Sequence, residues 1–144
     1  MGSNPAIICV VQARLNSSRI EKKLLQKLKG MSVIEWVIAR ISQSRMLDEI
    51  IFTLPIEDKH GPLEKLINKE RIPICFGEEN NLVDRFIQCL PKRKPYILVR
   101  VCADNPLICP LAVDHLVNFY LSSKFDYAFN HVPKQLHYQN LYPD

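Results

Sequence analysis

A cluster of cations and small polar side chains follows the first apolar stretch of the chain. It lies within residues 12–23, QARLNSSRIEKK, and consists of Arg14, Asn16, Ser17, Ser18, Arg19, Lys22 and Lys23. Hydroxyls and backbone N–H groups donate hydrogen bonds to phosphate oxygens, while Arg and Lys neutralise their charge. The residue types therefore predict an anion-binding loop, and a solvated basic loop is the open alternative.

A second chemical cluster surrounds Asp104. Asp104 and Asn105 follow the apolar run Tyr96–Val101 (YILVRV) and precede Pro106. Mg²⁺ binds one or two carboxylates together with phosphate oxygens and waters, so a carboxylate at the end of a buried strand suits this ion. One interpretation is Mg²⁺ on Asp104, with a nucleotide triphosphate supplying the other oxygens. The alternative is a plain turn before Pro106, which the residue types alone favour.

The elements that position these clusters alternate along the chain. Short apolar and aromatic runs predict five strands, at Ala6–Val11, Ile50–Leu54, Ile72–Phe76, Tyr96–Val101 and Asp126–Phe129. Helical periodicity predicts helices over residues 32–44, near 63–67, over 82–90 and from 110 to 120. Ser32 and Glu35 form a capping-box pattern at the first of these helices. Leu24, Leu25 and Leu28 predict a helical turn or a hairpin-like connector.

Alternation of strands and helices predicts an α/β fold with three α/β/α layers. The sheet is expected to be mostly parallel, with helices on both faces and right-handed crossovers. Ligands bind such sheets beyond the carboxyl ends of the strands, which places the loop after residue 12 and Asp104 on one edge. Residues 1–144 are expected to form a single domain, with an irregular tail over residues 130–144.

Composition narrows the class of partner. The chain has 144 residues, is 47% hydrophobic and carries a net charge of +4, so a phosphate-bearing ligand fits better than a nucleic acid. No apolar run approaches the ~20 residues that cross a bilayer, and no membrane partner is expected. Five cysteines occur without a C-x-x-C pair, and no signal peptide is apparent. These features predict free thiols and a cytoplasmic location.

The stretch VVQARLNSSR-x-x-x-K resembles the N-terminal signature of nucleotidyltransferases that make activated sugars. The greatest similarity is to cytidylyltransferases of the spore coat polysaccharide biosynthesis protein SpsF type, which are related to CMP-sialic acid and CMP-Kdo synthetases. That family usually reads ARxxSxRLPGK, whereas this chain has Ile20, Glu21 and Lys22 in place of Leu, Pro and Gly. Loss of Gly and Pro, with an added negative charge, predicts weaker or displaced nucleotide binding.

Two further motifs carry the resemblance. VRVCADNPLICP, residues 99–110, is similar to the family's VRxxGDxPLIDP, with Ala103 in place of Gly and Cys109 in place of Asp. NNLVDRF, residues 80–86, is similar to DVLDRY. The resemblance implies a nucleotide-diphospho-sugar transferase, Rossmann-like fold.

The resemblance also implies roles for individual residues. The implied catalytic residues are Arg14, Arg19, Lys23 and Asp104, and Asp104 is the implied Mg²⁺ ligand. The implied nucleotide contacts are Ala13, Arg14, Ser17, Ser18, Arg19, Lys23 and Arg100. The implied substrate contacts are Asp84, Arg85 and Asn105. For Asp84, a favourable charge at a helix N-terminus is the open alternative.

The activity implied by the resemblance is transfer of CMP from CTP to a sugar acid or related sugar in surface polysaccharide biosynthesis. The implied partners are CTP and a sugar acceptor. Family members continue into a second half, which holds a second acidic metal ligand and the contact through which they tend to dimerise. The resemblance therefore suggests a homodimer. It also suggests that this chain is without its C-terminal part. A nucleotide-binding domain without turnover is the alternative.

Overall fold

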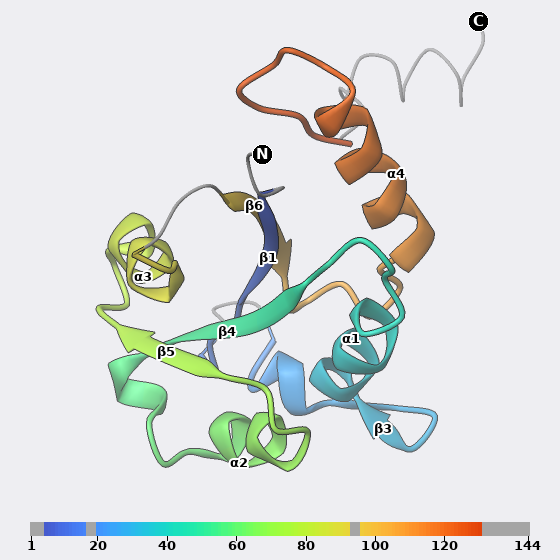
Figure 1. The fold of residues 1–144 in the computed structure, drawn as a ribbon. Helices are drawn as coiled ribbons and strands as arrows, with labels where there is room; N and C mark the ends of the chain where they lie inside the picture. The colour runs from blue at the N-terminus through green and yellow to red at the C-terminus, as the bar shows by residue number, and fades with distance from the viewer. Residues whose placement is uncertain (1–4, 17–19, 93–95, 131–144) are drawn as a thin grey trace, which may run out of the picture.

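The main sheet is parallel, and its strands are not ordered as they are in the chain. A computed structural model describes residues 5–16, 20–92 and 96–130 (Figure 1). The sheet order is β5-β4-β1-β6, formed by β1 (Ala6–Gln12), β4 (Glu49–Pro55), β5 (Ile74–Gly77) and β6 (Tyr96–Cys102). The chain runs outward from β1 through β4 to β5 and then returns to place β6 on the other side of β1. The sheet order therefore switches direction between β1 and β6, where open α/β sheets bind ligands.

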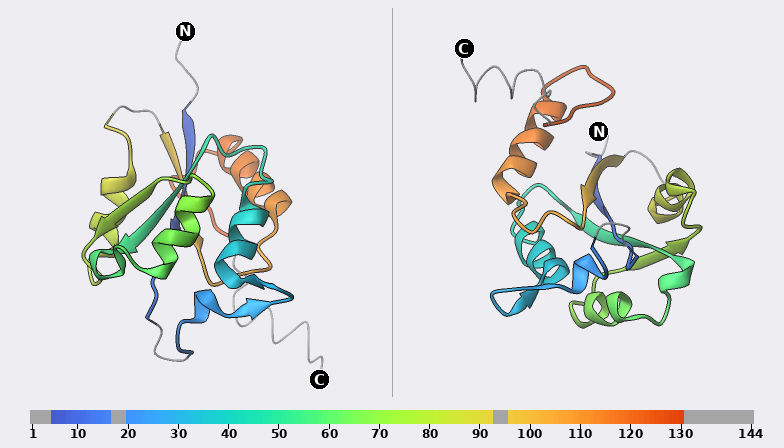
Figure 2. Two further views of the ribbon diagram at one scale, coloured as in Figure 1. Left: turned by 90° about the horizontal axis from the view of Figure 1, so that it is seen from below. Right: turned by 180° about the vertical axis from the view of Figure 1, so that it is seen from behind.

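Helices cover both faces of this sheet, which confirms the predicted α/β/α layers. The helices are α1 (Val33–Ile41), α2 (Pro62–Lys69), α3 (Leu82–Cys89) and α4 (Pro110–Leu121). Figure 2 shows α3 on one side and the other three helices on the opposite side.

The residues of β1 alternate between these two layers. Cys9 and Val11 belong to the core shared with α1 and α2, while Ile8 and Val10 pack with Phe86 of α3. Burial on both faces explains why the strand reads as a continuous apolar run.

The start of α1 has the capping box that the sequence predicts. The Ser32 N–H donates to Glu35 Oε2 at 2.7 Å, and the Glu35 N–H donates to Ser32 Oγ at 3.4 Å. Two hydrogen bonds lower the pKa of Glu35. The larger effect comes from the Ser32 hydroxyl and the smaller from the Ser32 N–H. Two orphan helix donors are thereby satisfied.

The segment after the basic loop contains both of the alternatives predicted for it, a helical turn followed by a hairpin. A 3₁₀ turn, η1 (Lys23–Leu25), leads into β2 (Lys27–Leu28) and β3 (Met31–Ser32). Lys29 and Gly30 at the hairpin tip both have positive φ, at 49° and 91°. The Trp36 indole N–H donates to Leu28 O at 2.8 Å and fastens the hairpin to α1.

The fifth predicted strand, Asp126–Phe129, is wrong. Residues 126–129 form no strand in the structure, and Tyr127 and Phe129 are exposed. Their rings stack on each other at 5.7 Å, and Phe125 stacks on Phe119 of α4. A strand needs a sheet neighbour, and residues 126–129 belong to neither of the sheets that the described residues form.

The predicted tail, residues 130–144, lies outside the described part of the chain except for Asn130. Within the described part, no helix combines the length and apolar character needed to cross a membrane.

Candidate functional site

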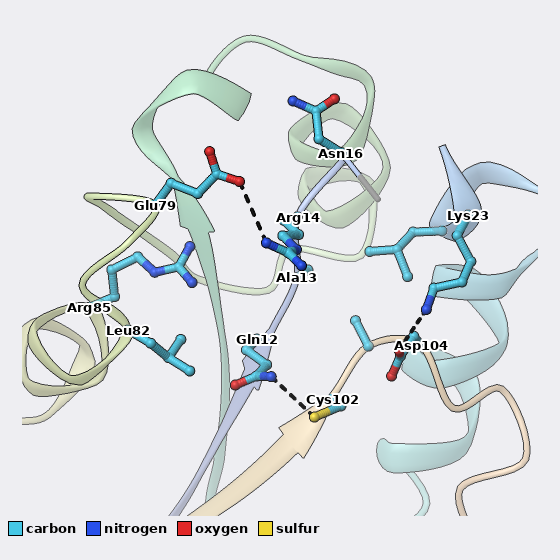
Figure 3. Close-up of a pocket in the computed structure, with 12 residues that line it drawn as sticks. Gln12, Ala13, Arg14, Asn16, Lys23, Glu79, Leu82, Arg85, Cys102 and Asp104 are labelled. Atoms are coloured by element: carbon cyan, nitrogen blue, oxygen red, sulfur yellow. Dashed lines mark hydrogen bonds and ion pairs between the residues drawn. The ribbon is translucent and has the colours of Figure 1, made fainter. Parts of the chain in front are cut away.

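A pocket of about 340 Å³ opens at the carboxyl ends of β1 and β6, where the sheet order switches direction (Figure 3). Its walls come from the segment after β1 including η1, the loops that follow β5 and β6, and α3. The lining residues are Gln12, Ala13, Arg14, Asn16, Lys23, Leu24, Glu79, Leu82, Arg85, Cys102, Ala103 and Asp104. The structure therefore brings together Ala13, Arg14, Lys23, Arg85 and Asp104 from the site predicted by sequence.

An ion pair joins the two predicted clusters. Lys23 Nζ donates to Asp104 Oδ2 at 2.7 Å, although the two residues are 81 positions apart. The side chains are 30% and 47% exposed, so the pair faces the pocket mouth and is partly solvated. Asp104 Oδ1 accepts no hydrogen bond from the described residues and is open to a ligand.

Arg14 lies in the middle of the pocket and pairs with Glu79, which follows β5. Arg14 Nη1 lies 3.7 Å from Glu79 Oε1, and both side chains are substantially exposed. Solvent screening makes this a weak ion pair, so Arg14 can turn toward an anionic ligand at a small cost in free energy.

A buried carboxylate fixes the start of the basic loop. Asp58 belongs to η2 (Ile56–Asp58), which follows β4, and its Oδ2 accepts the Leu15 N–H at 2.7 Å. Burial raises the pKa of Asp58, although the Leu15 N–H acts in the opposite direction. The contact holds the chain just beyond Arg14, which fixes where the loop leaves β1.

Arg85 is the most unusual group in the pocket. The residue is 5% exposed, and neither its Nε nor its Nη1 has a hydrogen-bond partner among the described residues. Burial lowers the pKa of Arg85, while the nearby Glu79 favours its charged form. Unsatisfied buried donors cost free energy, and a ligand acceptor would relieve that cost.

Gly77 permits this placement of Arg85. A Cβ added at position 77 would lie 2.6 Å from Arg85 Cγ, closer than real Cβ contacts occur. The glycine at the end of β5 therefore allows the guanidinium to approach the sheet.

Gln12 and Cys102 form the floor of the pocket. They are register partners at the ends of β1 and β6, and Gln12 Nε2 donates to Cys102 Sγ at 3.2 Å. Arg100 does not line the pocket. Its Nε donates to Gln12 Oε1 at 3.2 Å.

Two other predicted contact residues also lie outside the pocket lining. Asp84 Oδ2 accepts from Gln88 Nε2 at 2.6 Å in the first turn of α3, a place where a carboxylate suits the helix dipole. Asn105 Oδ1 accepts the Leu107 N–H at 3.2 Å, as in the turn that was the alternative for this segment. Ser17, Ser18 and Arg19 lie outside the described residues.

Sequence reasoning assigned no site role to Gln12, Asp58, Glu79, Leu82 or Cys102. Gln12 and Cys102 could have been predicted as site residues, because they are the last residues of β1 and β6 and Asp104 comes shortly after β6. Glu79 and Leu82 depend on how α3 packs, and no pattern in the sequence marks them.

The pocket residues fit Mg²⁺ in one arrangement, in which Asp104 and a bound phosphate both supply oxygen ligands. The described residues contain no group of three or more His, Cys, Asp or Glu side chains able to hold a metal. Asp104 alone, with one free oxygen, matches the share of ligands that Mg²⁺ takes from protein when phosphates supply the rest. Asp104 can therefore hold the ion only together with a phosphate ligand.

Comparison with known proteins identifies the family. A sequence model described as Cytidylyltransferase matches residues 8–141. The chain belongs to the cytidylyltransferase family. This finding confirms the resemblance drawn from the three motifs.

Two curated relatives illustrate the relationship. This cytidylyltransferase-family chain is 31% identical over 122 residues to an uncharacterized protein of Methanocaldococcus jannaschii, covering 85% of the chain and 50% of the relative. It is 24% identical over 127 residues to the spore coat polysaccharide biosynthesis protein SpsF of Bacillus subtilis, covering 85% of the chain and 53% of the relative. The chain thus spans about half the length of these relatives.

Solved structures agree on the fold. A cytidylyltransferase from Leptospira borgpetersenii superposes with a TM-score of 0.77 at 21% identity, covering 84% of this chain and 51% of that one. A CMP:2-keto-3-deoxy-manno-octonic acid synthetase complexed with CTP gives a TM-score of 0.70 at 22% identity, covering 82% and 48%. The described sheet and helices of this cytidylyltransferase-family chain therefore have the nucleotidyltransferase fold.

Proposed function

We propose that the pocket binds CTP with Mg²⁺, and that the protein transfers CMP to a sugar acid or related sugar in surface polysaccharide biosynthesis. The observation that carries this proposal is the ion pair between Lys23 and Asp104. It unites a cationic loop and a carboxylate at the edge of the sheet where phosphates bind in such folds. Family membership and the SpsF relative support the choice of nucleotide and pathway.

The chemistry is displacement at phosphorus. An oxygen of the acceptor forms a bond to the α-phosphorus of CTP, the bond to the bridging oxygen breaks, and pyrophosphate leaves. Catalysis of such a step depends mainly on positioning and charge neutralisation. Lys23 and Arg14 line the pocket and would neutralise the β- and γ-phosphates, and Arg19 is proposed to assist from the same loop.

Asp104 is the proposed Mg²⁺ ligand. When bound, the ion would supply charge neutralisation on the phosphate oxygens. Lys23 already holds Asp104 Oδ2 in place, so the carboxylate is oriented before any ligand arrives. We further propose that Ala13, Ser17 and Ser18 contribute to the phosphate cradle.

Arg85 is proposed as a ligand contact, because the residue lines the same pocket and its buried Nε and Nη1 have no partner among the described residues. Arg100 acts through Gln12, and the local hydrogen bonds of Asp84 and Asn105 favour structural roles for both residues. The five cysteines are free thiols, which suits the reducing cytoplasm that we propose as the protein's location.

A second candidate is nucleotide binding without turnover. The specific observation in its favour is the sequence IEKK at residues 20–23, where the family usually has LPGK. In this case the pocket would hold CTP, while the acceptor and the homodimer contact would require other residues.

A pyrophosphate-release assay separates the two candidates. The chain is incubated with CTP, Mg²⁺ and a panel of sugar acids, and thermal unfolding is followed in parallel. Release with any acceptor supports transfer by this chain. A Mg²⁺-dependent rise in Tm with CTP but no release supports the binding module. No change in Tm and no release would refute both.

A further inference from the structure

Two cysteines lie close together where α3 packs on the edge of the sheet. Cys75 belongs to β5, and Cys89 is the last residue of α3. Both pack in the apolar cluster around Phe86 that joins α3 to the sheet. β5 is an edge strand of the parallel sheet (Figure 1), so the two cysteines connect the helix to a strand with a sheet neighbour on one side only.

Hydrogen bonds place the two thiols side by side. Cys75 Sγ donates to Gln88 O at 4.0 Å, and Gln88 is the residue directly before Cys89. Cys89 Sγ donates to Arg85 O at 3.1 Å, within the last turn of α3. The side chains of Cys75 and Cys89 are also in hydrogen-bond contact with each other. The two sulfur atoms are therefore neighbours across the boundary between strand and helix.

The two thiols differ in access and in acidity. Cys75 is half-buried, whereas Cys89 is 6% exposed. Burial, and after it the contact with the Cys75 thiol, raises the pKa of Cys89 to about 12, so Cys89 stays protonated at neutral pH. A small oxidant therefore meets Cys75 first, and Cys89 lies where it can react with the product.

We propose that Cys75 and Cys89 are a reversible redox modification site, at which hydrogen peroxide converts the two thiols to a disulfide that ties α3 to β5. In the first step the Cys75 sulfur bonds to one peroxide oxygen, the O–O bond breaks and water leaves, which yields a sulfenic acid. In the second step the Cys89 sulfur bonds to the Cys75 sulfur, the S–O bond breaks, and a second water leaves with the Cys89 proton. The two sulfurs together lose two electrons, which the peroxide accepts.

The disulfide affects the wall of the pocket. Arg85 lines the pocket one helical turn before Cys89, and its carbonyl accepts the Cys89 S–H. Oxidation removes that hydrogen and fixes the end of α3 against β5, the strand that Glu79 follows into the pocket. This consequence is independent of which ligand the pocket binds, so the inference does not depend on the proposed function.

Inert packing is the competing explanation. Buried cysteines often act only as small apolar side chains. In that case the folded chain would not form the disulfide, and any pairing of cysteines would follow from unfolding.

Peptide mapping of the full chain tests the proposal. The reduced protein is treated with hydrogen peroxide, its remaining thiols are alkylated in denaturant, and it is digested with trypsin without reduction. Tryptic cleavage places Cys75 in peptide 72–85 and Cys89 in peptide 86–92. These peptides are expected to be linked in most molecules, with two of the five thiols lost, and dithiothreitol should restore all five.

Single substitutions provide the controls. Cys75→Ser removes the more accessible thiol and should abolish the linked peptides. Cys109→Ser is the matched control at an exposed cysteine and should leave the linkage unchanged. Oxidation should reversibly raise the Tm of the wild type and of Cys109→Ser, because a disulfide restricts the unfolded chain, and it should not raise the Tm of Cys75→Ser.

The outcomes are distinct. Oxidation in concentrated urea is the reference, in which the cysteines should pair without preference. A single linkage of Cys75 to Cys89 in the folded wild type supports the proposal. A folded wild type with no such linkage, or with the mixed pairs of the urea sample, overturns it even if Cys75→Ser does not fold. If the linkage forms but the ¹H–¹⁵N signals of Glu79 and Arg85 do not shift, the effect on the pocket wall is overturned.

Discussion

Lys23 Nζ and Asp104 Oδ2 lie 2.7 Å apart, so the loop after the first strand of the sheet meets the loop after the last. These loops are neighbours only because β6 returns to the side of β1 opposite β4. The switch in sheet order thus creates the meeting point of a cation and the carboxylate that we propose as a Mg²⁺ ligand. The nucleotide site that we propose follows from this one feature of topology.

Asp104→Asn should abolish the Mg²⁺ dependence of CTP binding. The amide keeps the size and one acceptor but loses the charge that the ion requires. Because the pair with Lys23 is partly exposed, the free energy of unfolding should change by less than about 1 kcal/mol. Titration of CTP with and without Mg²⁺, together with urea unfolding, measures both effects. Unchanged Mg²⁺ dependence would show that Asp104 does not bind the ion.

Arg85→Met should stabilise the fold while weakening CTP binding. The substitution removes two unsatisfied buried nitrogens and retains an apolar side chain of similar length. The free energy of unfolding should therefore rise by about 1–3 kcal/mol. Arg40→Met is the matched control. Arg40 Nε donates to Ile108 O at 2.6 Å, so its loss should instead destabilise. A destabilised Arg85→Met variant would mean that the guanidinium is satisfied within the fold.

Asp58→Asn tests the pH dependence of the loop anchor. Burial raises the pKa of Asp58 in the folded state above its ordinary value of 3.8, so the folded state binds the proton more tightly than the unfolded state. The stability that Asp58 contributes is fully present below pH 3.8 and is lost as pH rises through the folded pKa. Asparagine keeps an acceptor for the Leu15 N–H and does not titrate.

Urea unfolding at a series of pH values from about 3.5 to 7 provides the measurement for Asp58. The stability of the wild type relative to Asp58→Asn should fall as pH rises. A difference that is constant, or that grows with pH, would contradict the raised pKa.

Asp114→Ala should destabilise the packing of α4. Burial alone raises the pKa of Asp114, but hydrogen bonds from the Ser44 hydroxyl and from the N–H groups of Arg45 and Met46 outweigh it and lower the pKa overall. Removal of the Asp114 carboxylate leaves these donors without their acceptor, which should lower the free energy of unfolding by about 1–3 kcal/mol.

The contribution of Asp114 has the opposite pH sign to that of Asp58. Because the folded pKa is lowered, the stabilisation is present above pH 3.8 and is lost as pH falls through the folded pKa. Asp114→Asn retains one acceptor and should cost less than the alanine variant. Equal stability of the wild type and Asp114→Ala at pH 7 would refute the role of this carboxylate.

Local patterns in the sequence predicted local structure well. The capping box of Ser32 and Glu35 depends on residues three apart, and it forms as expected. The two strands that precede Lys23 and Asp104 in the chain were also predicted, because apolar runs mark buried strands and the ligand edge follows from their direction.

Features that depend on packing between distant segments could not be read from the sequence. The burial of Arg85 requires Gly77 to lie beside it, and the link from Arg100 to Gln12 requires the register of β1 with β6. The strand predicted at Asp126–Phe129 failed for a related reason. Tyr127 and Phe129 of this segment stack on each other, the preceding Phe125 stacks on Phe119 of α4, and residues 126–129 join neither sheet of the described chain.

The most direct test of the account is a ¹H–¹⁵N correlation spectrum of the chain titrated with Mg²⁺ and CTP. The account predicts saturable shifts of Gln12, Lys23, Arg85 and Asp104, with residues of α2 unaffected. Shifts that are absent, or that are confined to residues away from this pocket, would contradict the claim that CTP binds where β1 and β6 end.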